Sequence, residues 1–338
     1  MGIIMKILYR IPYPGAIGAD RWIYEGWRNA FCALGHRFYE LTHFHNIEQR
    51  TEEVQPDILM ISANINIVKN GSILQKIKRR GVCIFLLIDW PRSSKEINII
   101  KKEDIADIYF GEREPESMKE FERATGRKYH LIPNAADKNI HFPVKPQKKY
   151  DYDIVYLGAK LPKKKWFFDN VLLPLKKKYK VGIFGPYWTA SDNILRGIQK
   201  LSRSLKLTEF ANMVNARRIS IPPQEERQLY SSAKISLNFH ERESDGSQPH
   251  YILNQRTFKI PACGGFQICD EVPALRKYFT EKEVVMAKLD PEDWFKKIDY
   301  YLKNAKEREK IRQAGAKRAL KEHTYHNRVK QVIELTQP

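Results

Sequence analysis

Cysteine is scarce in this 338-residue chain, which has only four. They stand at Cys32, Cys83, Cys263 and Cys269, without the C-x-x-C spacing of a zinc ribbon or a redox site. So few scattered thiols exclude a disulfide scaffold and fit a reducing compartment.

Long apolar runs are also missing. The opening MGIIMKILYRIPYPG is interrupted by Lys6 and ends at Arg10 and Pro12, so it is too short for a signal peptide. No stretch approaches the ~18 apolar residues of a transmembrane helix. We therefore expect a soluble, cytoplasmic protein.

Several motifs of common enzyme classes are absent: GxGxxG, the P-loop GxxxxGK[ST], HExxH, GxSxG and any Cys/His cluster. The loop after the first predicted strand has only Gly15 and Gly18, and the loop after 152–158 has only Gly158. These absences argue against dinucleotide oxidoreductases, P-loop NTPases, metalloproteases and α/β-hydrolases.

Charge is abundant and mostly positive, with a formal net charge of +19. Residues 160–228 alone hold 15 basic and five acidic residues. Such a field attracts polyanions, namely nucleic acid, an acidic membrane surface or an anionic polymer. The alternative is that it serves solubility and one phosphorylated small molecule.

Apolar runs alternate with helical patterns twice along the chain, which predicts two parallel sheets covered by helices. Strands are expected at 5–11, 36–42, 57–63, 82–89, 105–111 and 129–135, with helices at 21–34, 72–81 and 114–125 between them. The pattern restarts after a linker with strands at 152–158, 179–187, 234–240 and 265–270 and helices at 166–179, 256–264, 290–302 and 305–323.

The fold class is therefore α/β, with two Rossmann-like domains. We expect an N-terminal domain at 1–145, a C-terminal domain at 146–310, and a final helical segment at 311–338 that packs back toward the first domain. Residues 188–218 fit this alternation least well. They predict an inserted pair of basic helices whose apolar positions lie on one helical face.

One segment of the second half carries a family resemblance. The run N-x-R-T-F-x-I-P-A-C-G-G-F-x-x-x-D from Asn254 resembles the CgeB-like glycosyltransferases, as do the segments at 19–36, 131–143, 229–240 and 307–329. The resemblance implies a GT-B fold, in which two Rossmann-like domains face each other across a cleft. It also implies that a sugar passes from a UDP-, GDP- or CDP-linked donor on the C-terminal domain to a hydroxyl acceptor on the N-terminal domain. No bound metal or cofactor is expected.

The same resemblance points to donor-binding residues. Arg256 and Asn254 match the family's Asn-x-Arg positions and begin a predicted helix, where positive charge suits a diphosphate. Thr257 adds a hydroxyl. Their structural alternative is helix capping or surface exposure. Further donor-side candidates follow predicted strands or helices: Gly158, Lys160, His240 and Gly264.

Lysines dominate the loop after 152–158. One of Lys160, Lys163, Lys164 and Lys165 is expected to face phosphate while the others are solvated, and Lys160 lies nearest the strand.

Lys259 departs from the family pattern. Many GT-B enzymes have at this position a Glu that holds the donor ribose. With a lysine at this position, the sequence does not assign the ribose contact. It also does not assign the retaining chemistry that goes with that contact. Lys259 is expected either to meet a phosphate or an acidic sugar, or to point outward.

Three carboxylates follow predicted strands of the first domain and are candidates to bind or deprotonate the acceptor hydroxyl. Asp89 and Asp20 are the first two, with a loop cap and a helix N-cap as their structural alternatives. Glu112 is the third, on the acceptor side, where Gly15 and Gly18 are also expected. The reaction needs only one base.

Together these features predict a glycosyltransferase whose acceptor is a polyanion, such as DNA with hydroxylated bases or an anionic surface polymer. The alternative is a non-catalytic protein on the same scaffold that binds nucleic acid or a membrane surface.

Overall fold

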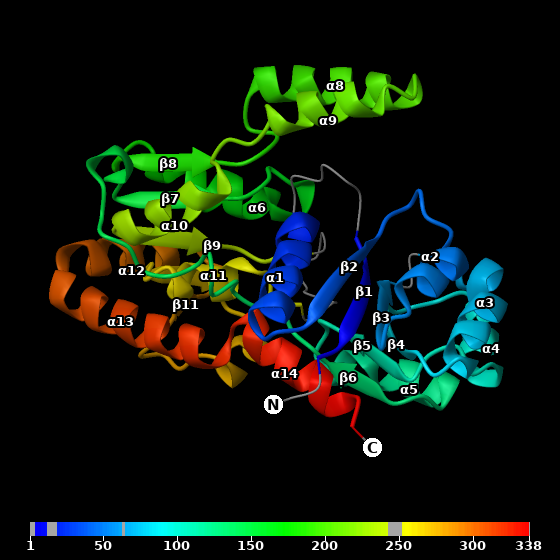
Figure 1. The fold of residues 1–338 in the computed structure, drawn as a ribbon. Helices are drawn as coiled ribbons and strands as arrows, with labels where there is room; N and C mark the ends of the chain where they lie inside the picture. Colours follow the sequence, from blue (N-terminus) through cyan, green and yellow to red (C-terminus); the bar gives the residue numbers. More distant parts are fainter. Residues whose placement is uncertain (1–3, 12–18, 63–64, 243–251, 338) are drawn as a thin grey trace.

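The computed structural model describes residues 4–11, 19–62, 65–242 and 252–337, and it contains two α/β domains (Figure 1). Each domain is built on one fully parallel β-sheet, so the two predicted parallel sheets are confirmed.

The N-terminal sheet has six strands in the order β2-β1-β3-β4-β5-β6. The central strands β3 and β4 read ILMIS and CIFLL and are largely buried, as strands covered on both faces are. The strands span Lys6–Arg10 (β1), Arg37–Leu41 (β2), Ile58–Ser62 (β3), Cys83–Leu87 (β4), Ile108–Gly111 (β5) and Tyr129–Leu131 (β6). The α-helices of this half span Ala19–Ala33 (α1), Ile47–Val54 (α2), Ile67–Arg79 (α3), Ser94–Lys102 (α4) and Lys119–Thr125 (α5).

Alternate residues of β3 face opposite sides of this sheet. Leu59 and Ile61 belong to one apolar cluster, with residues of α2 to α5, whereas Ile58 and Met60 belong to a second, with residues of α1. The sheet therefore lies between two layers of helices, and its carboxyl edge is left for polar residues.

The C-terminal sheet has five strands in the order β11-β10-β9-β7-β8. Its strands span Ile154–Leu157 (β7), Val181–Phe184 (β8), Ile235–Asn238 (β9), Gln267–Asp270 (β10) and Val285–Ala287 (β11). The α-helices of this half span Lys165–Phe167 (α6), Leu173–Leu175 (α7), Ala190–Ser204 (α8), Thr208–Ala216 (α9), Pro223–Ser232 (α10), Arg256–Ala262 (α11), Pro291–Lys303 (α12), Ala305–Glu322 (α13) and Tyr325–Leu335 (α14).

Some elements differ from the expectation. The helix predicted at 166–179 is interrupted by a π-helical turn at Phe168–Leu172 and ends early, and Pro174 lies in its last α-turn, where it has no amide N–H to donate. The helix α4 was not predicted, although the capping box of Ser93 and Glu96 marks its start. Its single turn of apolar residues was too short to be read as a periodic pattern.

The chain crosses between the domains twice. Ala136 of the first crossing pairs with Thr324 of the second. The helix α14 then packs against α1, with Tyr325 buried in the N-terminal core beside Trp27. Gly26 makes this contact feasible, because a Cβ there would lie 2.2 Å from the Tyr325 ring.

None of the helices in the described part of the chain is both long enough and apolar enough to span a bilayer.

Candidate active site

Arg256, the first residue of α11, lies at the carboxyl edge of the C-terminal sheet. Its Nη1 donates to the carbonyl oxygen of Leu157 at 2.9 Å, and its Nη2 donates to that of Phe239 at 3.2 Å. These carbonyls end β7 and follow β9, and the Tyr156 ring centroid lies 5.1 Å from the guanidinium carbon. The two bonds use only part of the five-donor fork of an arginine. The geometry holds a buried positive charge where parallel sheets bind ligands.

Gly158 makes room for this arginine. A Cβ on Gly158 would lie 2.3 Å from Nη1 of Arg256. The Gly158 amide donates to Phe184 at 2.8 Å, which continues the pairing of β7 with β8. The missing side chain of Gly158 therefore gives Arg256 its place, and the donor-side role of Gly158 stays a prediction.

Lys164 is the second cation at this edge, and only 5% of it is exposed. Burial and then the nearby charge of Arg256 lower the pKa of Lys164 to about 7. Within the described ranges, no hydrogen-bond or ion-pair partner contacts its ammonium group. A charge on a largely buried lysine without a partner is costly, so this group is suited to an anionic ligand.

Lys160, which the sequence favoured, is exposed, and its Nζ lies 5.6 Å from the Trp188 ring centroid. The sequence placed Lys164 in a lysine run but had no signal to separate the buried lysine from its solvated neighbours.

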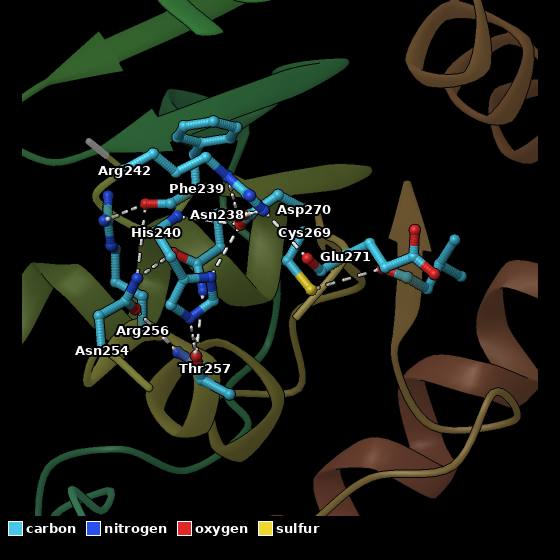
Figure 2. Close-up of polar contacts among 11 residues, drawn as sticks. Asn238, Phe239, His240, Arg242, Asn254, Arg256, Thr257, Cys269, Asp270 and Glu271 are labelled. Carbon is cyan, nitrogen blue, oxygen red and sulfur yellow. Dashed lines mark hydrogen bonds and ion pairs between the residues drawn. The ribbon is translucent and has the colours of Figure 1, made fainter. Parts of the chain in front are cut away.

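A buried polar network lies next to Arg256 (Figure 2). The His240 ring is 2.8 Å from Oδ1 of Asp270 through Nδ1 and 3.0 Å from the Thr257 hydroxyl through Nε2. The Asn254 amide donates to Oδ1 of Asn238 at 2.9 Å. These contacts tie the start of α11 to the ends of β9 and β10. Thr257, His240 and Asn254 therefore position the site, and their polar groups are already engaged.

Asp270 anchors that network. It is the closing Asp of the motif that begins at Asn254, but sequence analysis assigned it no role. Its carboxylate also accepts from Nη2 of Arg242 at 2.7 Å. Burial alone would raise the pKa of Asp270, but His240 and Arg242 outweigh it and hold the pKa below its usual value. Two signals could have identified Asp270: it closes the quoted motif, and it is the last residue of an apolar strand.

Lys259 and Gly264 lie elsewhere on α11. The Lys259 ammonium forms a buried ion pair with Glu226 of α10 at 2.6 Å and lies 4.6 Å from the Trp22 ring centroid of α1. The charge that the sequence left unassigned thus has a partner and bridges the two domains. Gly264 has a φ of +67° in the turn after α11 and abuts Pro143, so it serves the turn.

Glu112 follows β5 at the carboxyl edge of the N-terminal sheet. Its Oε2 accepts from the Asn134 amide at 2.9 Å, and the same amide donates to the Leu253 carbonyl at 3.1 Å. Arg113 also pairs with Ile252. Glu112 therefore lies beside the segment that leads into Arg256, which joins the two sheet edges in one site.

Burial raises the pKa of Glu112 to about 7, with smaller contributions from the charges of Asp89 and Asp20. Asp89 is exposed and lies 3.4 Å from Nη2 of Arg113. Asp20 is exposed in the first turn of α1. The three predicted carboxylates therefore converge, and Glu112 is the one tuned to exchange a proton near neutral pH. Gly15 and Gly18 lie outside the described residues.

Across the described ranges, no three His, Cys, Asp or Glu side chains gather into a metal-binding group.

A family model described as glycosyl transferase-like matches residues 163–334, just over half of the chain. No curated protein sequence matches.

Three solved structures resemble this one over almost the whole chain. A glycosyltransferase from Rickettsia africae has a TM-score of 0.67 at 13% identity, covering 98% of this chain and 97% of its own. A sucrose-phosphate synthase from Thermosynechococcus elongatus has a TM-score of 0.64 at 13% identity, with 98% of both chains covered. An alpha-glucosyltransferase in complex with UDP and a 13-mer DNA has a TM-score of 0.63 at 12% identity, with 100% of both covered.

At these identities the likeness concerns the fold, and with the two parallel sheets it confirms the predicted GT-B architecture. The narrower CgeB-like assignment stays a prediction. Because the family model spans the second half of the chain, including Lys164 and Arg256, the chain belongs to the glycosyl transferase-like family.

Proposed function

We propose that this glycosyltransferase takes its sugar from a nucleoside-diphosphate donor and transfers it to a hydroxyl on an anionic polymer. The observation that carries the donor assignment is Lys164, a lysine only 5% exposed near the charge of Arg256, whose ammonium has no protein partner in the described part of the chain.

A diphosphate is the ligand that these two cations fit. Arg256 offers the N–H donors that do not bond to the carbonyls of Leu157 and Phe239, and Lys164 adds a point charge. In a buried site with little water, both charges act strongly on phosphate oxygens. Their attraction increases as the diphosphate leaves, so they lower the barrier to transfer.

Glu112 is the proposed base. The acceptor oxygen attacks the anomeric carbon, the bond from that carbon to the diphosphate oxygen breaks, and the acceptor proton passes to Glu112. Its pKa of about 7 places the proton exchange near neutral pH. Asp89 and Asp20 assist by raising that pKa.

UDP is the first nucleotide to test, because the alpha-glucosyltransferase of similar fold binds it. That protein was also solved with DNA. Together with the net charge of +19, this supports an anionic acceptor, either hydroxylated DNA or a surface polymer.

The test is donor hydrolysis and thermal shift with UDP-, GDP- and CDP-sugars. We expect one nucleotide to raise the melting temperature and Lys164→Met to abolish that shift, because the shift follows binding. Lys160→Met is the matched control, since that lysine is exposed and should leave the shift unchanged.

If no nucleotide shifts the melting temperature and no donor is turned over, the alternative of a non-catalytic binder replaces this proposal.

A further inference from the structure

The helices α8 and α9, with the capping residue Arg217, form a hairpin that projects from the C-terminal domain beyond β8 (Figure 1). A buried pair of Arg218 with Asp192, at 2.8 Å, fixes its base. The proposed donor and acceptor sites do not use it.

This hairpin exposes a concentration of apolar side chains. Half of the large apolar side chains that are exposed in the described residues belong to it. They are Ile194, Ile198, Leu201, Leu205, Leu207, Phe210 and Met213.

The exposed residues form a face. On α8, Ile194 is followed by apolar residues four, seven and eleven positions later, the spacing of one helical side. The residues that α8 buries are polar, with Gln199 and Ser202 among them. The helix α8 thus keeps polar groups inside and turns its apolar side outward, whereas α9 buries Ala211 and Val214. This arrangement needs an apolar cover, because a patch of this kind marks an interaction site.

The exposed charges of the hairpin indicate which partner covers its apolar face. The exposed charged residues of the hairpin are five cations against one acid: Arg196, Lys200, Arg203, Lys206 and Arg217, with Glu209. A second copy of the hairpin would bring the same positive charge to the contact. Duplex DNA would match the cations but would leave the leucines in water. An anionic bilayer surface offers acyl chains for the apolar face and headgroup charge for the cations.

We propose that the α8–α9 hairpin docks onto an anionic lipid surface. The apolar face, which the sequence placed on one helical side, enters the interface between headgroups and acyl chains, and the cations bind the lipid phosphates. The basic charge of 188–218 then serves membrane contact. This docking is independent of sugar transfer and is measured without donor.

The experiment is co-sedimentation of the full-length protein with vesicles. Vesicles of phosphatidylcholine mixed with phosphatidylglycerol should retain the protein, and vesicles of phosphatidylcholine alone should retain it much less. The double variant Leu201→Gln/Phe210→Gln should bind the mixed vesicles at least about tenfold more weakly, since it removes two exposed apolar side chains that would enter the bilayer.

The matched control is Leu34→Gln/Leu289→Gln, which removes two exposed apolar residues outside the hairpin and should bind as the parent does. Lys200→Gln/Arg217→Gln should weaken binding by about fivefold per charge. Lys176→Gln/Lys177→Gln is its control. Melting curves show that each variant is folded.

Four results would overturn the proposal. Three of them are no retention by mixed vesicles, equal loss in the Leu34/Leu289 control, and a dimer that only Leu201→Gln/Phe210→Gln converts to monomer. Such a dimer would show that a second copy of the chain covers the apolar face. A duplex-DNA gel shift lost in that same variant would assign the face to nucleic acid and would equally reject the lipid surface.

Discussion

Nη1 of Arg256 occupies the space that a side chain on Gly158 would take, with only 2.3 Å between that atom and a Cβ placed on the glycine. The neighbouring contact is equally close, since a Cβ on Gly185 would lie 2.4 Å from the Gly158 carbonyl oxygen. The backbone here is packed around one guanidinium, so the glycine and the arginine act as a unit.

Replacing Gly158 with alanine should therefore move the guanidinium and break its bonds to the carbonyls of Leu157 and Phe239. We expect a loss of about 1–3 kcal/mol in the free energy of unfolding, as for other disrupted buried networks. Nucleotide binding should fall with it. Urea unfolding and calorimetric titration with the active nucleotide measure both.

The control for this variant is Gly197→Ala, because Gly197 lies in α8 and a Cβ there would meet no atom within 4 Å. It should stabilise the helix slightly and leave nucleotide binding unchanged. Equal effects of the two substitutions would show that the space at Gly158 is not needed.

Lys164 should take up a proton when the diphosphate binds. With a pKa of about 7 it is mostly neutral at pH 8, and two phosphate groups beside it favour the charged form. Calorimetry at pH 8 in two buffers of different ionisation enthalpy should show proton uptake on binding, and Lys164→Met should remove it. Uptake that persists in the Lys164 variant would assign the proton to another group.

Glu112 should set the acidic limb of the pH–rate profile. Because a base acts when deprotonated, the rate should fall as pH drops below about 7. Glu112→Gln should lower kcat by about 10²–10⁴-fold and flatten that limb. If Asp89→Asn instead removes the limb and Glu112→Gln keeps it, Asp89 is the base.

The same carboxyl group links pH to stability. The pKa of Glu112 rises from 4.5 in the unfolded chain to about 7 in the folded one, so the folded state binds the proton more tightly. This contribution to stability is therefore lost as pH rises from about 4.5 through 7. Glu112→Gln should lose less stability than the parent over that range, which melting temperatures at pH 5 and pH 8 would show.

Replacing one partner of the buried Lys259–Glu226 ion pair should cost more unfolding free energy than replacing both. Lys259→Met leaves the Glu226 carboxylate buried without its cation, which should cost about 3–5 kcal/mol of unfolding free energy. Lys259→Met/Glu226→Gln should recover most of that loss. Urea unfolding of both variants and of Glu226→Gln completes the cycle, and simple additivity of the single effects would contradict the ion pair.

Much of the fold could be read locally. The apolar runs ILMIS and CIFLL predict strands buried on both faces, and Gly35 and Gly81 predict where the helices at 21–34 and 72–81 end. Short elements were not predicted from the sequence, because β11 has three residues and α4 has little more than two turns. Periodicity needs length before it can be recognised.

The site was harder to predict than the fold. Arg256 was predicted from its motif and does lie at the sheet edge, but Lys164 could not be told from Lys163 or Lys165. Likewise, sequence analysis put Asp89 and Asp20 ahead of Glu112, whereas the structure shows that Glu112 is the one that is partly buried and bonded to Asn134. Burial depends on packing between distant segments, and burial is what shifts a pKa.

The sequence by itself determined two parallel α/β domains, an arginine at the start of α11 and an apolar side on α8, because alternation and helical spacing follow from neighbours along the chain. Only the tertiary structure decided that Lys164 is enclosed, that Lys259 is paired with Glu226 and that the apolar side of α8 faces outward. Each of these depends on contacts between segments far apart in sequence, which fix solvent access and therefore charge and exposure.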